Sequence, residues 1–179
     1  GLTAFVGITL LLTTMSPPAR LSVRQAFILT TTSWLALTLF AALPFAFADL
    51  ELNFTDAFFE AMSGLTTTGS TVITTLDTAP SGILLWRAIL QWLGGIGIIV
   101  MSIAILPMLK IGGNQLFRTE SSDSSDKVLP RVAQVASGVG FVYLALTAAC
   151  AALLWLTGLN GFDAIAHAMT TIATGGYST

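Results

Sequence analysis

The sequence contains 179 residues, of which 54% are hydrophobic and 9% are charged, whereas a soluble domain has about 25% charged residues. This composition excludes an ordinary soluble domain and predicts a protein embedded in a lipid bilayer, with no nucleic acid partner. The net charge of −2 adds little, and the single cysteine, Cys150, excludes an internal disulfide framework.

Uncharged stretches of the chain mark the candidate membrane helices. Each of the stretches 1–19, 25–48, 88–109 and 132–162 is long enough for a spanning helix of about 20 residues. We therefore expect membrane helices near residues 2–16, 24–47, 83–109 and 133–157. No charged segment precedes the first apolar stretch, so we expect no signal peptide there, and we interpret the chain as a piece of a longer protein.

The basic residues predict how these helices are oriented. All lysines and arginines except Arg87 lie in the two loops at 20–24 and 110–131. Basic loops stay on the cytoplasmic side of a membrane, so segment 49–87 is expected to face outward. We expect a multi-pass protein of the inner (plasma) membrane. Its Ser-rich loop at 118–127 is interpreted as a solvated cytoplasmic linker rather than a phosphorylation switch.

An internal repeat relates two parts of the chain by an offset of 107 residues. Segments 56–69 and 163–176 share Asp, Ala, Ala, Met, Thr and Gly at equivalent positions. In each copy we expect a short helix, at 54–64 and at 162–172, with an acidic residue in its first turn. These helices are too short to cross a bilayer, so each is expected to be re-entrant, entering the membrane and ending part-way.

Each short helix is followed by residues rich in threonine and glycine, which we call the first Thr/Gly segment (66–71) and the second Thr/Gly segment (173–178). A dehydrated cation needs several oxygen ligands, which main-chain carbonyls and threonine hydroxyls supply, while glycine permits the unusual dihedral angles required. Either segment alone is equally consistent with a plain turn. Their occurrence at equivalent positions after equivalent helices favours an ion path.

Four motifs together indicate a family. They are DAFFEAMSGLTTTG at 56–69, QWLGGIGIIV at 91–100, ILPML at 105–109 with Gly112-Gly113, and TGGYST at 174–179. With these motifs the chain resembles the TrkH/KtrB branch of the potassium transporters that have four membrane–pore–membrane repeats. The resemblance covers most of residues 50–179, and segment 112–118 favours TrkH over KtrB.

The resemblance implies an all-α membrane fold of membrane helix–pore loop–membrane helix repeats with re-entrant pore helices. Residues 1–19 would end an N-terminal membrane domain, and 20–118 would form the first repeat. Residues 119–131 would be the cytoplasmic linker, and 132–179 the first helix and pore loop of a truncated second repeat.

The resemblance also implies the residues of a selectivity filter. They are Thr66, Thr67, Thr68, Gly69, Thr174, Gly175 and Gly176. Gly69 and Gly176 would be the filter glycines, with potassium at the carbonyls of Thr67, Thr68, Thr174 and Gly175. The second segment has Thr174 before Gly-Gly where the first has Thr-Thr-Gly, so the symmetry is approximate. The family assembles as a homodimer with a cytoplasmic nucleotide-binding regulatory subunit, and its gating loop lies in a later repeat.

We therefore expect potassium uptake, with no cofactor besides the transported ion. The alternatives are a sodium-permeable or poorly selective relative of the same fold, and a structural membrane subunit. An enzyme is not expected, because the chain has one histidine, no Cys/His cluster and no carboxylate pair at membrane depth. Channel-like flux and coupling to protons or sodium (symport) remain open alternatives.

Three polar positions and a glycine cluster complete the set of candidates. Glu60 and His167 occupy equivalent positions in the short helices, where a polar anchor is favoured over an electrostatic tuner of the pore. Arg87 is expected to pair with an acidic residue near the short helices, which the sequence does not identify. The glycines at 94, 95 and 97 are interpreted as helix-packing positions rather than a phosphate-binding loop.

Overall fold

The computed structural model describes residues 7–9, 22–48, 50–105 and 128–179. The regular elements in these ranges are all helices, which confirms the expected all-α fold. In chain order they are α2 (Val23–Ala46), α3 (Phe54–Leu65), the 3-10 helix η1 (Leu76–Thr78), α4 (Ser81–Ile105), α5 (Val128–Leu156) and α6 (Gly161–Ile172).

Parts of the predicted organisation lie outside these ranges. Residues 7–9 are helical, but the rest of the helix expected near 2–16 lies outside the described residues, as does motif 112–118. Most of the predicted linker, 119–131, lies outside them as well. Its last residues belong to α5, which begins at Val128 rather than near 133.

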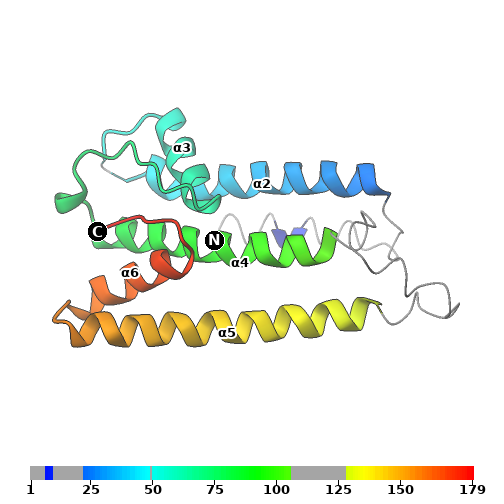
Figure 1. Ribbon diagram of the computed structural model, residues 1–179. Coiled ribbons are helices and arrows are strands. Elements are labelled where there is room, and N and C mark those ends of the chain that lie inside the picture. The colour runs from blue at the N-terminus through cyan, green and yellow to red at the C-terminus, as the bar shows by residue number, and fades with distance from the viewer. Residues whose placement is uncertain (1–6, 10–21, 49, 106–127) are drawn as a thin grey trace, which may run out of the picture.

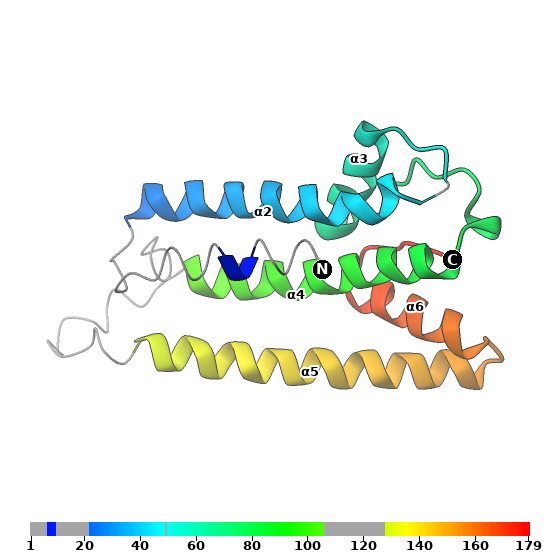
Figure 2. The ribbon, with the colours of Figure 1, turned by 180° about the vertical axis from the view of Figure 1, so that it is seen from behind.

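Three long helices, α2, α4 and α5, lie side by side and alternate in direction along the chain, as Figure 1 and the reverse view in Figure 2 show. Within the described residues these three contain stretches long and apolar enough to cross a bilayer, namely Arg24–Ala46, Ser81–Met101 and Gln134–Leu156. The alternation agrees with the spans predicted from the charge pattern.

Helices α3 and α6 are much shorter. Each has 12 residues, about 18 Å at 1.5 Å per residue, whereas the hydrocarbon core of a bilayer is about 30 Å thick. Both lie at the end of the molecule where α2 and α5 end and α4 begins (Figure 1). Their length and position are those of re-entrant helices.

Local sequence explains where α2 begins and ends. Ser22 and Gln25 form a capping box, in which each side chain accepts a hydrogen bond from the main-chain N–H of the other residue. Pro44 lies in the last turn, and the helix ends two residues later at Ala46. Proline has no N–H to bond the carbonyl four residues earlier, and its ring crowds that carbonyl, so it weakens the last turn of this helix.

The buried core lies between α2, α3 and α4. It is rich in alanine, which lets α3 approach α2 closely, and it contains Ala41, Ala42, Phe45, Ala57, Ala61, Leu65, Ile73, Ile83 and Leu90. By contrast, α5 exposes large apolar side chains such as Phe141, Leu153 and Trp155. Exposed apolar side chains on a long apolar helix are suited to a lipid environment.

Of the glycines at 94, 95 and 97 in α4, the first two allow close packing. A Cβ at Gly94 would overlap the carbonyl oxygen of Leu65 at the end of α3, and a Cβ at Gly95 would lie 2.6 Å from the Tyr143 hydroxyl of α5. The packing role predicted for these two glycines is confirmed. Gly97 is different, because the nearest atom to its Cβ position belongs to Trp34 and is 4.0 Å away.

Candidate functional site

The two short helices begin in the same way. Asn53 Oδ1 accepts a hydrogen bond of 2.9 Å from the main-chain N–H of Asp56, and Asn160 Oδ1 accepts one of 2.9 Å from Asp163. Each asparagine thereby satisfies a donor that the first turn of a helix leaves free. The repeat found in the sequence is therefore also a repeat of local structure.

The two helices also end in the same way. The main-chain N–H of Thr68 donates to the carbonyl of Ser63 at 2.9 Å, and that of Gly175 donates to Thr170 at 3.0 Å. The main-chain N–H of Thr67 donates to Gly64 at 3.0 Å and that of Thr174 donates to Thr171 at 2.9 Å, which completes the Schellman motif in both copies. Each Thr/Gly segment therefore starts at the negative end of a helix dipole.

Left-handed backbone occurs at equivalent residues of the two Thr/Gly segments. The φ angles are 55° at Thr67 and 79° at Gly69 in the first, and 57° at Thr174 and 77° at Gly176 in the second. Thr67 and Thr174 occupy the helix-terminating position where glycine is usual, and a threonine there costs about 1–2 kcal/mol. Strained backbone of this kind is concentrated at functional sites.

The two Thr/Gly segments meet each other. The carbonyl oxygen of Gly175 lies against the Cα of Gly69, so that a Cβ at Gly69 would overlap it. A Cβ at Gly176 would meet no atom within 4 Å among the described residues. The structure therefore brings Gly69 and Gly175 together, and a carbonyl of the second segment faces the glycine of the first.

The threonine side chains of the first Thr/Gly segment have different partners. The Thr66 hydroxyl donates to the carbonyl of Met62 at 2.8 Å and lies 2.8 Å from the Thr68 hydroxyl. Thr68 is then the donor of the second bond, since the Thr66 proton is already used. Thr66 is the C-cap residue of α3, and its hydroxyl is tied to that helix.

Glu60 of α3 is fully buried behind the first Thr/Gly segment. Its carboxylate accepts hydrogen bonds from the Thr71 hydroxyl at 2.9 Å, from the main-chain N–H of Val72 at 3.0 Å and from Arg87 Nε at 2.8 Å. Glu60 is therefore the acidic partner of Arg87 that the sequence did not identify. These contacts support the anchor interpretation of Glu60.

His167, at the equivalent position of α6, has a different environment. Its Nδ1 lies 2.8 Å from the main-chain carbonyl of Asp163 in its own helix, and its side chain is half-buried. The repeat is thus symmetric in its backbone and asymmetric at this side chain.

Arg87 connects the ion pair to the second Thr/Gly segment. Its Nη1 donates to the carbonyl of Ser178 at 2.7 Å, and its guanidinium carbon lies 4.0 Å from the centre of the Tyr177 ring. The Tyr177 hydroxyl shares its single proton between the carbonyls of Glu60, at 2.9 Å, and Ser70, at 3.2 Å. Burial raises the pKa of the Tyr177 phenol, so it remains a protonated donor.

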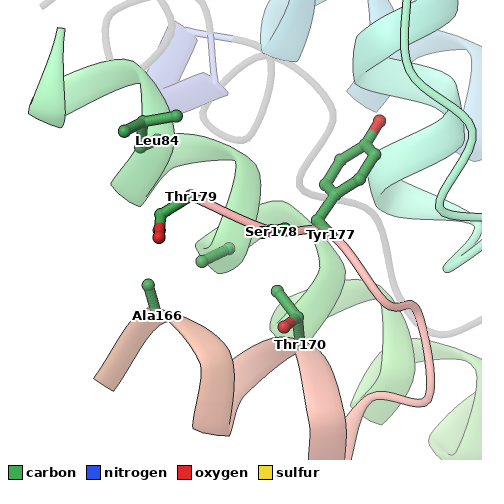
Figure 3. Close-up of a pocket in the computed structure, with 7 residues that line it drawn as sticks. Leu84, Ala166, Thr170, Tyr177, Ser178 and Thr179 are labelled. Carbon is green, nitrogen blue, oxygen red and sulfur yellow. The ribbon is translucent and has the colours of Figure 1, made fainter. Parts of the chain in front are cut away.

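Figure 3 shows the end of the second Thr/Gly segment running between α4 and α6. The Tyr177 ring points away from Ala166 and Thr170 of α6. The chain then returns to the start of α6, where the Thr179 hydroxyl donates to Asp163 Oδ1 at 2.7 Å. Hydrogen bonds from Thr179 and from Asn160 lower the pKa of Asp163 and keep its carboxylate charged.

Gln91, one turn after Arg87 in α4, lies against both Thr/Gly segments. Its Oε1 accepts a hydrogen bond of 3.1 Å from the main-chain N–H of Tyr177, and a Cβ at Gly175 would overlap the Gln91 amide. Its Nε2 is buried without a partner among the described residues. In the sequence, Gln91 was noted only as the first residue of the motif QWLGGIGIIV and not as a candidate site residue. An amide side chain in an otherwise apolar span is the signal that could have identified it.

These features define a membrane protein built from helix–pore loop–helix repeats. A family model described as "TrkH: Cation transport protein" matches residues 2–179, and the chain belongs to this family. The resemblance to the TrkH/KtrB branch is thereby confirmed, and the relatives named below are transporters rather than enzymes.

Named relatives agree with this assignment. The chain is 49% identical over 161 residues to the Trk system potassium uptake protein TrkI of Halomonas elongata, covering 90% of the chain and 33% of that protein. It is 48% identical over 159 residues to Trk system potassium uptake protein TrkH of Escherichia coli K12, covering 87% of the chain and 33% of that protein.

A solved structure is also similar. The crystal structure of the potassium transporter TrkH from Vibrio parahaemolyticus matches with a TM-score of 0.83 and 43% identity, over 97% of this chain and 34% of that one. The chain thus spans about a third of the length of the relatives that it matches.

Proposed function

We propose that this chain supplies two sectors of the potassium path of a transporter that takes up potassium across the plasma membrane. The observation that supports this most is the contact between the two Thr/Gly segments, in which the Gly175 carbonyl lies against Gly69. Segments from separate repeats must meet in this way if their carbonyls line one path. The names of the relatives, which are potassium uptake proteins, support potassium as the ion.

In the proposed filter, carbonyls of Thr67, Thr68, Thr174 and Gly175 replace part of the hydration shell of the ion. Gly69 and Gly176 take the left-handed backbone that presents them. The negative ends of the α3 and α6 dipoles stabilise the cation electrostatically, so the filter itself needs no carboxylate.

The wider assembly follows from the family resemblance and is part of the same proposal. The transporter is a multi-pass protein of the inner membrane, a homodimer, and a partner of a cytoplasmic nucleotide-binding regulatory subunit. Segment 49–87, which contains α3, faces outward, and the loop between α4 and α5 faces the cytoplasm.

Substitution of Gly69 tests the proposed filter in a full-length transporter that contains this chain. In Gly69→Ala the new Cβ would overlap the Gly175 carbonyl and strain the left-handed backbone by about 1–3 kcal/mol. We expect a loss of potassium preference of about tenfold or more, since each 1.4 kcal/mol changes relative affinity about tenfold. Potassium-limited growth of an uptake-deficient host, with and without competing sodium, measures it.

Gly82→Ala is the matched control, because a Cβ at Gly82 meets nothing within 4 Å. It is expected to grow like the wild type. If Gly69→Ala were equally abundant in the membrane and kept wild-type preference for potassium, the filter would lie elsewhere. If sodium could replace potassium in supporting growth of the wild type, or if sodium blocked that growth, the poorly selective alternative would be favoured. If the wild type took up no cation at all, a structural subunit would be favoured.

A further inference from the structure

A buried ion pair lies beside the two Thr/Gly segments and not within the apolar core. The side chains of Glu60 and Arg87 are 0% and 1% exposed, and Arg87 Nε lies 2.8 Å from Glu60 Oε1. Removing two charges from water costs several kcal/mol for each ion, so a buried pair gives little net stability compared with apolar side chains of the same size. The hydrogen bonds that the pair makes to other groups are therefore the feature to explain.

Each member of the pair is bonded to the outer end of a different Thr/Gly segment. Glu60 accepts from the Thr71 hydroxyl and from the main-chain N–H of Val72, at the end of the first segment. Arg87 donates to the carbonyl of Ser178, at the end of the second. Thr71 and Ser178 are equivalent in the 107-residue repeat. One ion pair thus connects equivalent points of the two segments.

Tyr177 adds a second connection between the same segments. Its ring lies under the Arg87 guanidinium, and its hydroxyl donates to the carbonyls of Glu60 and Ser70. Ser70 is the repeat equivalent of Tyr177, so this bond also joins matching points. Gln91 holds the main-chain N–H of Tyr177 from the α4 side. The outer end of the second segment is therefore fixed by α3 and α4 together.

We propose that Glu60 and Arg87 are positioning residues that set the spacing between the two Thr/Gly segments and thereby the preference for potassium over sodium. The inference rests on the proposed function. Selectivity depends on how carbonyl oxygens are placed around the ion. This holds whether the size of the cavity or the number and field strength of the carbonyl dipoles is the dominant factor. A shift of one segment relative to the other changes both quantities. Neither side chain needs to touch the ion.

Arginine is suited to this role because its planar guanidinium presents several donors in fixed directions. It bonds Glu60 through Nε and Ser178 through Nη1 while its face lies over Tyr177. Lysine keeps the charge but acts as a single point donor. Arg87→Lys can therefore keep one of these contacts but not all three. Because the variant keeps the positive charge, any change in selectivity is due to the lost contacts and not to the charge.

The test measures potassium and sodium flux through the purified full-length transporter in liposomes, normalised to the amount of protein. Arg87→Lys is expected to lower the potassium-to-sodium flux ratio by about threefold to tenfold, the equivalent of one lost hydrogen bond. Glu60→Gln leaves the buried Arg87 charge unpaired and is expected to reduce protein abundance strongly. The double variant Glu60→Gln/Arg87→Gln should regain abundance, because no unpaired charge remains, and still show the lowered ratio.

Trp86→Phe is the matched control for a purely structural effect. Trp86 lies beside Arg87 in α4, and its Nε1 donates a 3.0 Å hydrogen bond to the carbonyl of Ala41 in α2. The substitution removes this bond, which does not involve the Thr/Gly segments. It is expected to lower abundance without changing the flux ratio. The inference is overturned if Arg87→Lys and the double variant behave like Trp86→Phe, while the wild type remains potassium-selective. A wild type without potassium uptake would instead overturn the proposed function.

Discussion

Gly175 is packed closely on two sides. The carbonyl of this residue lies against Gly69, and its own Cα lies against the Gln91 amide. There is no room for a Cβ on either side of this contact. Backbone-to-backbone contact of this closeness fixes the distance between the two carbonyl sectors, which is the quantity that an ion-selective path must control.

The closeness of Gly175 and Gln91 predicts a compensating pair of substitutions. Gly175→Ala should lower the thermal stability of the purified full-length protein, because overpacking of a buried site costs about 1–3 kcal/mol. Adding Gln91→Ala removes the side chain that obstructs the new methyl group and should restore part of the loss. The cost of the double variant should therefore be smaller than the sum of the two single costs.

Gly138→Ala provides the reference for this series, since a Cβ at Gly138 of α5 meets nothing within 4 Å. Alanine is favoured over glycine within a helix, so this variant should melt at or slightly above the wild-type temperature. A Gly175→Ala protein as stable as Gly138→Ala would show that the two segments are not packed as tightly as described.

At the scale of elements, α3 and α6 are each defined by their own ends. An asparagine cap begins the helix and a Schellman motif stops it after 12 residues. The stop places the helix C-terminus, with its partial negative charge, directly beside the Thr/Gly segment. The short length of these helices is therefore encoded locally and is required for their position beside the proposed path.

The caps predict unequal costs in the two repeats. Asn53→Ala should destabilise the protein by about 1 kcal/mol, the usual cost of a lost N-cap. Asn160→Ala should cost more, because Asn160 Nδ2 also donates to Asp163 Oδ2 at 2.6 Å. Thermal unfolding of the purified full-length variants measures both. Serine at either position keeps a capping oxygen and should recover most of the loss at 53 and less of it at 160. If the alanine variants had the same melting temperature as the wild type, the two asparagines would not be stabilising N-caps.

Helix positions could be predicted from the sequence because the signals are local. The expected spans 24–47 and 83–109 correspond to α2 and α4, and the short helices at 54–64 and 162–172 correspond to α3 and α6. The expected span 133–157 corresponds to the apolar stretch Gln134–Leu156 of α5. The helix itself begins at Val128, earlier than expected, since the charged residues before the apolar stretch do not end it. They mark only the edge of the apolar region, and a helix can continue past it into water.

Side-chain partners could not be predicted, because they connect residues far apart in the chain. Arg87 contacts Glu60 and Ser178, which are 27 and 91 residues away, and the Tyr177 hydroxyl bonds Glu60 from 117 residues away. The 107-residue repeat predicted that two equivalent segments exist. It did not predict that a polar cluster from α3 and α4 joins them, since only one copy of the repeat has a glutamate at this position.

At the scale of the whole molecule, the described residues form three long antiparallel helices with two short helices gathered at one end. From α4, Arg87 bonds the carbonyl of Ser178 and Gln91 bonds the main-chain N–H of Tyr177, so this helix holds the second Thr/Gly segment. The arrangement resembles that of the Vibrio parahaemolyticus potassium transporter, of which this chain covers 34%.

A comparison of potassium and sodium flux through the full-length protein in liposomes tests the proposed potassium path most directly. Vesicles with equal and opposite gradients of the two ions report the ratio without any effect of growth or expression. The proposed path predicts potassium flux at least about tenfold above sodium flux, a preference of 1.4 kcal/mol or more, and a ratio near one in Gly69→Ala. Equal flux of the two ions through the wild type, or a Gly69→Ala protein with an unchanged ratio, would contradict the account.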